Sequence, residues 1–77
     1  MQATQANIVV DVKRALSRQS SAALVRELGG MHGVSRAWLS PRARRLMLVD
    51  YDPKVTSSQR ILGTVVRRGF DARLIGM

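Results

Sequence analysis

Side chains able to bind a metal or act as a nucleophile are few in this sequence of 77 residues. It has one histidine, His32, four methionines and no cysteine. Without a thiol there is no disulfide, no thiolate ligand and no thiol nucleophile. His32 with Met31 and Met47 could in principle hold Cu(I) weakly, since imidazole and thioether groups are ligands for this ion. We instead expect core or solvent-exposed roles, with the methionines filling the core.

The acidic residues give no catalytic pattern. The five are Asp11, Glu27, Asp50, Asp52 and Asp71. They form no paired constellation with a nucleophile, as general acid and base catalysis would need. The sequence therefore predicts a protein that is not an enzyme and carries no cofactor.

Basic residues dominate the charge. Thirteen Lys and Arg against five Asp and Glu give a formal net charge of +8. This balance favours acidic protein surfaces, phosphates or nucleic acid as partners through long-range attraction. Charge alone does not choose among them.

Hydrophobic spacing predicts the elements that position these side chains. The short run of residues 8–12 is rich in β-branched side chains, which is typical of a strand. A first helix follows over residues 20–30, with nearby serines able to cap it. Its apolar face has the spacing i, i+4 and i+7 and consists of Leu24, Leu28 and Met31.

The second half of the chain predicts a hairpin, a helix and a last strand. Strands over 34–40 and 45–51 are separated by the turn-forming residues 41–44. Thr56 begins a capping box that ends at Gln59. The buried stripe of this second helix is Ile61, Leu62, Val65 and Val66. Glycine at position 69 ends the helix, and the alternating residues of the last strand are Phe70, Ala72 and Leu74.

The element order β-α-β-β-α-β predicts an α+β fold, the ferredoxin-like sandwich with two helices on one face of a four-stranded antiparallel sheet. We expect a single domain over 1–77, with 1–6 as a disordered tail. The longest apolar runs are four to five residues. They are too short for a signal peptide or a membrane span, so we expect no membrane insertion and a cytoplasmic location.

Four motifs are more specific than the element order. They are Gly33-Val34, Val49-Asp50-Tyr51-Asp52-Pro53, Thr56-Ser57 and Gly69-Phe70-Asp71-Ala72. Through them the chain from Ile8 to Leu74 resembles the heavy-metal-associated (HMA) domains of copper chaperones, mercury-binding proteins and metal-pumping ATPases. The resemblance implies the same ferredoxin-like fold and a connection with metal homeostasis.

The metal-binding motif of that family is degenerate here. In the family, the loop after the first strand carries Met-x-Cys-x-x-Cys, whose thiolates bind a soft ion. Counting back from Gly33 without a gap, the methionine falls on Ala15 and the cysteines fall on Ser17 and Ser20. A serine hydroxyl is a hard, neutral oxygen that cannot replace a thiolate. The resemblance therefore assigns no metal.

The predicted topology brings three basic segments to one end of the sheet. Their eight basic residues are Lys13, Arg14, Arg18, Arg42, Arg44, Arg45, Arg67 and Arg68. The first helix also begins there, which makes a candidate anion site. Its members are Ser17, Ser20, Arg14, Arg18 and Arg68. The alternatives are a basic protein interface without a discrete pocket and a solvated cap that serves solubility.

The sheet face away from the helices carries a second candidate surface. In the family register, Trp38, Leu46 and Leu48 point to this open face, with Val9 and Ile75 as further members. Large exposed apolar clusters tend to mark interfaces, so we expect a contact patch that could also form a homo-oligomer. A shifted strand register, or a tail lying over the patch, is the alternative.

RNA-recognition domains share this topology and are often basic. They stack bases on aromatic residues of the two central strands, where this chain has aliphatic and acidic ones. Trp38 alone, on an edge strand, is a poor stacking platform. We do not expect nucleic acid as a partner.

The sequence as a whole predicts a protein-binding or regulatory module. It would engage an acidic protein partner through its basic end, its open face, or both. The alternative is a heavy-metal transport or homeostasis protein that binds an ion unconventionally, through His32 or at a subunit interface.

Overall fold

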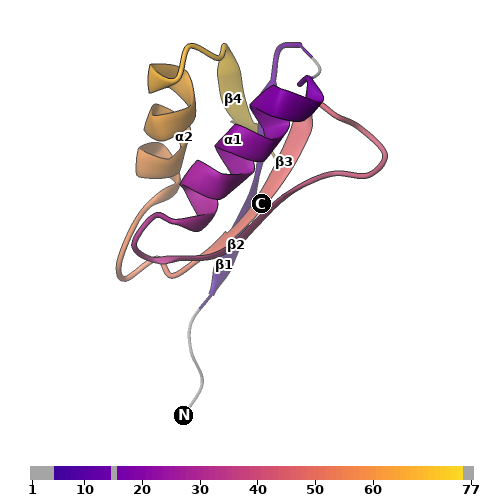
Figure 1. Ribbon diagram of the computed structural model, residues 1–77. Helices are drawn as coiled ribbons and strands as arrows, with labels where there is room; N and C mark the ends of the chain where they lie inside the picture. The colour runs from indigo at the N-terminus through magenta and orange to yellow at the C-terminus, as the bar shows by residue number, and fades with distance from the viewer. Residues whose placement is uncertain (1–4, 15, 76–77) are drawn as a thin grey trace.

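The computed structural model describes residues 5–14 and 16–75. Its six elements follow the predicted order (Figure 1) and are β1 (Ala6–Val12), α1 (Arg18–Gly29), β2 (Val34–Leu39), β3 (Leu46–Tyr51), α2 (Ser58–Arg67) and β4 (Ala72–Ile75). Most of the predicted 1–6 tail lies outside the described residues, but Ala6 is the first residue of β1. The hairpin connection runs from 40 to 45, because β2 ends and β3 begins one residue inside the predicted limits.

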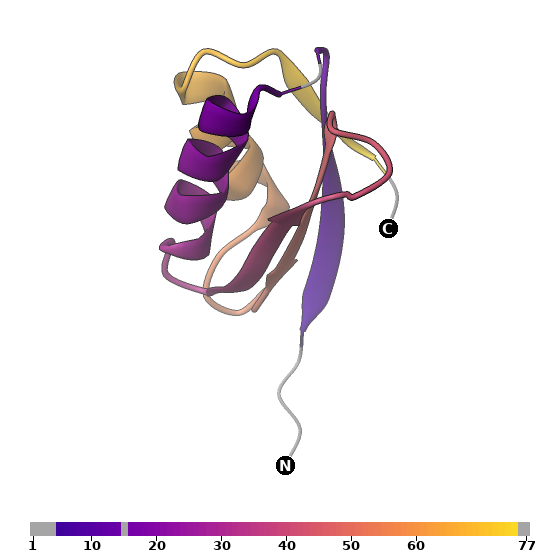
Figure 2. The same cartoon turned by 45° about the vertical axis from the view of Figure 1, so that its right-hand side comes forward.

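The four strands form one antiparallel sheet in the order β2-β3-β1-β4. Both helices lie on the same face of this sheet, as the turned view in Figure 2 shows. This arrangement confirms the predicted ferredoxin-like α+β sandwich. It leaves the second face of the sheet without a helix.

The core lies between the sheet and the helices. Alternation along the strands turns every second side chain toward it, so Val10, Met47 and Val49 are fully buried. Leu24 and Leu28 of α1 and Ile61 and Val65 of α2 cover them. Met47 is therefore a core residue.

The first helix begins two residues earlier than expected. Ser17 is its N-cap, since the Ser17 hydroxyl accepts a hydrogen bond from the backbone N–H of Ser20 at 3.1 Å. The helix continues to Gly29, and Met31 beyond it packs against the core while half-buried.

The second helix begins at Ser58, with Ser57 and not Thr56 as its N-cap. The Ser57 hydroxyl accepts the backbone N–H of Arg60 at 3.2 Å, so the predicted capping box is wrong. Val66 is also misplaced in the predicted stripe, because it is 49% exposed. Its place in the core is taken by Thr64, whose hydroxyl bonds to the Arg60 carbonyl at 3.0 Å.

The end of α2 follows the glycine prediction. Gly69 has a φ of +96°, in the left-handed region. The N–H groups of Gly69 and Phe70 bond to the carbonyls of Val66 and Val65, which is the Schellman pattern. Phe70 therefore lies before β4, not in it, and packs against the core.

Within the part of the chain that the structure describes, neither helix has the length and apolar character needed to cross a membrane.

Candidate functional site

Three connections meet at one end of the sheet, as predicted: β1–α1, β2–β3 and α2–β4 (Figure 1). Backbone hydrogen bonds join them. The N–H of Lys13 donates to the Asp71 carbonyl at 2.7 Å, and the N–H of Leu16 donates to the Arg44 carbonyl at 3.2 Å. We call this the basic end, and its basic residues are Lys13, Arg14, Arg18, Arg42, Arg44, Arg45, Arg67 and Arg68.

Leu16 anchors the β1–α1 connection and was not singled out from the sequence. Its side chain is 4% exposed, and its carbonyl also accepts the Nε–H of Arg44 at 3.2 Å. The loop is therefore fixed to the hairpin on both sides of this residue. The available signal was an isolated leucine within a polar segment, which is typical of a buried anchor.

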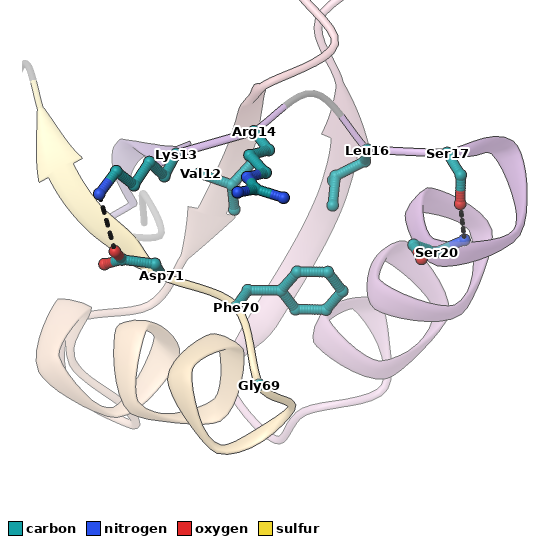
Figure 3. Close-up of a pocket in the computed structure, with 9 residues that line it drawn as sticks. All are labelled: Val12, Lys13, Arg14, Leu16, Ser17, Ser20, Gly69, Phe70 and Asp71. Carbon is teal, nitrogen blue, oxygen red and sulfur yellow. Dashed lines mark hydrogen bonds and ion pairs between the residues drawn. The ribbon is translucent and has the colours of Figure 1, made fainter.

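The two serines expected at the cysteine positions of the family motif, Ser17 and Ser20, have different surroundings. Both line an open hollow of about 580 Å³ (Figure 3), but the exposed Ser17 uses its hydroxyl oxygen as the helix cap, whereas the half-buried Ser20 lies in the first turn. The Phe70 ring lies inside this hollow, with Lys13 and Arg14 at its rim. Hydroxyls, an aromatic ring and cationic groups do not fit a soft metal ion. Ala15 lies outside the described residues.

All eight basic residues of the basic end are exposed. Three make ion pairs with acids: Lys13 with Asp71 at 3.8 Å, Arg45 with Asp11 at 3.0 Å, and Arg68 with Glu27. Among the described residues, the guanidinium groups of Arg14, Arg18 and Arg42 make no ion pair. The structure therefore brings the predicted basic residues together and leaves a surplus of positive charge.

Asp11 is an acidic residue of this end whose role the sequence did not reveal. It lies on the open side of the sheet, yet its side chain is only 7% exposed, because Arg45 and Arg73 lie against it at 3.0 and 3.5 Å. The hydrogen bond from Arg45 lowers the pKa of Asp11 below its ordinary value of 3.8, with Arg73 assisting and burial opposing. This carboxylate joins β1, β3 and β4.

The residues considered for unconventional metal binding lie at the opposite end. His32 follows α1 and is exposed, and the neighbouring Met31 is half-buried. Within residues 5–14 and 16–75, no three His, Cys, Asp or Glu side chains are grouped as a metal site would require. The predicted anion site also has no buried polar atom awaiting a partner in the described part of the chain, and it stays a prediction.

The open face carries a continuous apolar row. Cross-strand pairing places Trp38 beside Leu48, Leu48 beside Val9, and Val9 beside Ile75, so one row crosses all four strands. Each member is partly exposed. Leu46 extends the row toward the basic end, next to Asp11. The predicted members of the patch therefore share one face, in the expected register.

Polar side chains flank this row on both sides. Away from the basic end lie Arg36 and Asp50, which are cross-strand neighbours. The Arg36 guanidinium lies 4.2 Å from the centre of the Trp38 ring, a cation–π contact that covers one ring face. Toward the basic end lie Asp11, Arg45 and Arg73.

No protein-family model matches the sequence, and it matches no curated protein. Solved structures are similar over nearly the whole chain. Oxidized MerP from Ralstonia metallidurans CH34 superposes with a TM-score of 0.82 at 15% identity, covering 95% of this chain and 100% of that chain. A copper binding domain from HMA7, a P-type ATPase, gives 0.80 at 21% identity, covering 91% and 93%.

The N-terminal soluble domains of Bacillus subtilis CopA give a TM-score of 0.79 at 24% identity, covering 92% of this chain and 48% of that chain. At these identities the likeness establishes the fold. The chain has the ferredoxin-like fold of these domains, but without the cysteine ligands that the family motif carries.

Proposed function

We propose that the protein is a non-enzymatic binding module that docks an acidic surface of a partner protein through its basic end. The observation that carries the proposal is the convergence of eight exposed basic residues from three connections. Within the described part of the chain, three of the eight are paired with acids. The connections are held together by backbone hydrogen bonds and by Leu16, so the backbone positions that carry the charges are fixed relative to one another. Preorganised charge favours fast, selective docking to a complementary surface.

The comparison with the fold relatives bears on the sign of the charge that this end suits. By name they include a metallochaperone and a copper binding domain of a P-type ATPase. Their fold is the same, but the end that carries cysteines in the family motif has serines, a phenylalanine and guanidinium groups here. The basic end therefore suits negative charge better than a soft cation.

The test compares two triple variants of equal charge. Arg14→Glu/Arg18→Glu/Arg42→Glu reverses charges at the basic end. The control reverses three exposed residues at the other end of the molecule, with the substitutions Arg26→Glu, Lys54→Glu and Arg60→Glu. Each reversal changes the charge by two, so both variants carry +2 instead of +8. The probe is a ten-residue glutamate peptide titrated at low salt.

We expect the basic-end variant to lose about tenfold or more in affinity and the control to lose about threefold or less. NMR shifts should concentrate at the three connections. Equal losses in the two variants would show that net charge alone matters and would overturn the proposal. Tighter binding of a mixed single-stranded oligonucleotide than of the peptide would assign the end to nucleic acid instead.

A metal-handling role is the second candidate, favoured by the names of the fold relatives. The only imidazole available is that of the exposed His32. Titration with Cu(I) and with Zn(II), followed by NMR, separates the two functions. Submicromolar binding with shifts confined to residues near His32, abolished by His32→Ala, would establish this candidate over the acidic-partner proposal.

A further inference from the structure

The hollow at the basic end has an apolar interior and a charged rim. Val12 and Leu16 form buried parts of its wall, and the ring of the half-buried Phe70 lies inside it (Figure 3). Lys13 and Arg14 stand at the rim with exposed side chains. Interface pockets that receive an anchoring side chain have this arrangement, in which a polar surround excludes water from an apolar centre once the partner is bound.

Backbone hydrogen bonds fix both sides of the hollow. On one side, the N–H of Phe70 donates to the Val65 carbonyl at 3.4 Å after the left-handed turn at Gly69. On the other side, the N–H of Leu16 donates to the Arg44 carbonyl at 3.2 Å. The hollow therefore exists before a partner arrives, and little ordering of the backbone is needed to bind one.

The acids near the hollow are already matched by cations. Asp71, which is among the lining residues, lies 3.8 Å from Lys13 in an exposed pair. The other two acids toward this end are also paired, Glu27 with Arg68 and Asp11 with both Arg45 and Arg73. None of these acids therefore gives the rim a net negative charge.

The cations that remain make the surroundings of the hollow positive. Arg14 at the rim makes no ion pair with any described residue, and neither does Arg18, which follows Ser17 at the start of α1. The Nε–H of Arg44 donates to the Leu16 carbonyl at 3.2 Å, so this guanidinium adds charge beside the wall. A segment with carboxylates next to an apolar residue complements such a site.

The shape of the hollow favours a side chain of a protein over a free small molecule. Its volume of about 580 Å³ lies within the roughly 300–1,000 Å³ of small-molecule sites, but those sites enclose most of the ligand surface. In this open hollow a free molecule would leave its outer side in water. A side chain carried by a docked segment would instead be covered by that segment.

We propose that the hollow receives one large apolar side chain, best an aromatic one, from the acidic partner, with neighbouring carboxylates of that partner facing Arg14 and Arg18. This inference rests on the proposed function and names the kind of segment through which the partner docks. An aromatic side chain is preferred because its ring packs edge to face or offset against Phe70. Charge brings the partner to the basic end, and the hollow selects among acidic segments.

Two peptides of equal charge test the proposal. Each has five glutamates on either side of a central residue, which is phenylalanine in one peptide and alanine in the other. We expect the phenylalanine peptide to bind about fivefold tighter or more in an NMR titration at low salt, because its ring is buried. Intermolecular nuclear Overhauser effects should connect this ring to the Phe70 ring and to the Leu16 methyl groups.

A substitution that fills the hollow provides a matched pair of variants. Ser20→Phe places a ring at the wall without changing the charge. Ala22→Phe is the control, since Ala22 is exposed on the same helix and lies about 200° further around its axis. We expect the two peptides to bind Ser20→Phe within about twofold of each other, whereas Ala22→Phe should keep the preference for phenylalanine. If Ser20→Phe fails to fold by circular dichroism, the Overhauser effects to Phe70 and Leu16 decide alone.

The ratio of the two affinities separates this proposal from the proposed function. Equal affinities for the two peptides, or a preference that survives Ser20→Phe, would overturn the anchoring role and leave docking at the basic end intact. Equal losses of alanine-peptide affinity in the two charge-reversal variants would instead overturn the proposed function, with the preference for phenylalanine still measurable. A mixed single-stranded oligonucleotide that binds the original chain tighter than either peptide and is weakened by Ser20→Phe would assign the hollow to a base and overturn the anchoring role.

Discussion

At the residue scale, Gly33 is required for both backbone and packing reasons. Its φ of +97° lies in the left-handed region, and a Cβ built on it would lie 2.9 Å from Val55 Cγ1 and 3.0 Å from Thr56 Cγ2. Its carbonyl accepts the backbone N–H of Asp52 at 2.7 Å. Residues 55 and 56, which precede α2, therefore pack directly against the backbone at the start of β2, and a side chain at position 33 would not fit.

Gly33→Ala and Gly69→Ala form a matched pair, since Gly69 has nearly the same φ but open space around it. We expect Gly69→Ala to lower the free energy of unfolding by about 1–2 kcal/mol, the cost of a left-handed alanine. Gly33→Ala should cost a further 1–3 kcal/mol, approximately, from overpacking. Urea unfolding measures both, and equal losses would rule out the steric contribution.

At the scale of the elements, Asp11 links the central strand β1 to both of its neighbours. Its carboxylate on β1 is held by Arg45 beside β3 and by Arg73 on β4, and these contacts lower its pKa. A carboxyl whose pKa is lowered in the folded state stabilises the fold above its unfolded pKa, which for Asp11 is the ordinary value of 3.8. That contribution disappears as the pH falls through the lower folded value.

Replacement of Asp11 by Asn should therefore lower the free energy of unfolding at pH 7 but have progressively less effect below about pH 4. There the carboxyl of the original protein becomes protonated, first in the unfolded chain and then, at lower pH, in the folded protein. Urea unfolding at pH 7, 5, 4 and 3 measures the difference. Asp71→Asn is the control, because its pair with Lys13 is long and exposed and should contribute little at any pH. An Asp11 effect of constant size across this range would contradict the assignment.

The elements themselves could be predicted from the sequence, because strand alternation and helical spacing are local patterns. The side-chain register of Trp38 and Leu48 followed from the same alternation. The N-cap of α2 could not be chosen, since Thr56 and Ser57 both carry a hydroxyl. The structure decides between them: Thr56 is buried against Gly33, which frees Ser57 to cap.

The same limit applies to the candidate site. The convergence of the basic connections follows from topology alone, so the sequence predicted it. The burial and lowered pKa of Asp11 depend on Arg45 and Arg73, which lie 34 and 62 residues away in the chain. No local sequence pattern contains such long-range contacts. Leu16 likewise depends on a hairpin distant in sequence.

At the scale of the whole molecule, positive charge is concentrated at one end and opposes folding by self-repulsion. We expect the free energy of unfolding at 5 μM protein to rise by about 1 kcal/mol between 20 mM and 500 mM NaCl, roughly the size of one close charge contact in water. The Arg14→Glu/Arg18→Glu/Arg42→Glu variant should show a smaller increase. An equal increase in both proteins would mean that the basic end does not carry the repulsion.

Trp38 gives the molecule a natural optical reporter. It is the only tryptophan of the chain, it lies on the open face, and a guanidinium rests on its ring. Its emission therefore reports on one surface alone. A ligand that covers the apolar row should shift the emission to shorter wavelength. A ligand that binds at the basic end should leave the spectrum unchanged. The two surfaces can thus be distinguished in a cuvette without attaching a label.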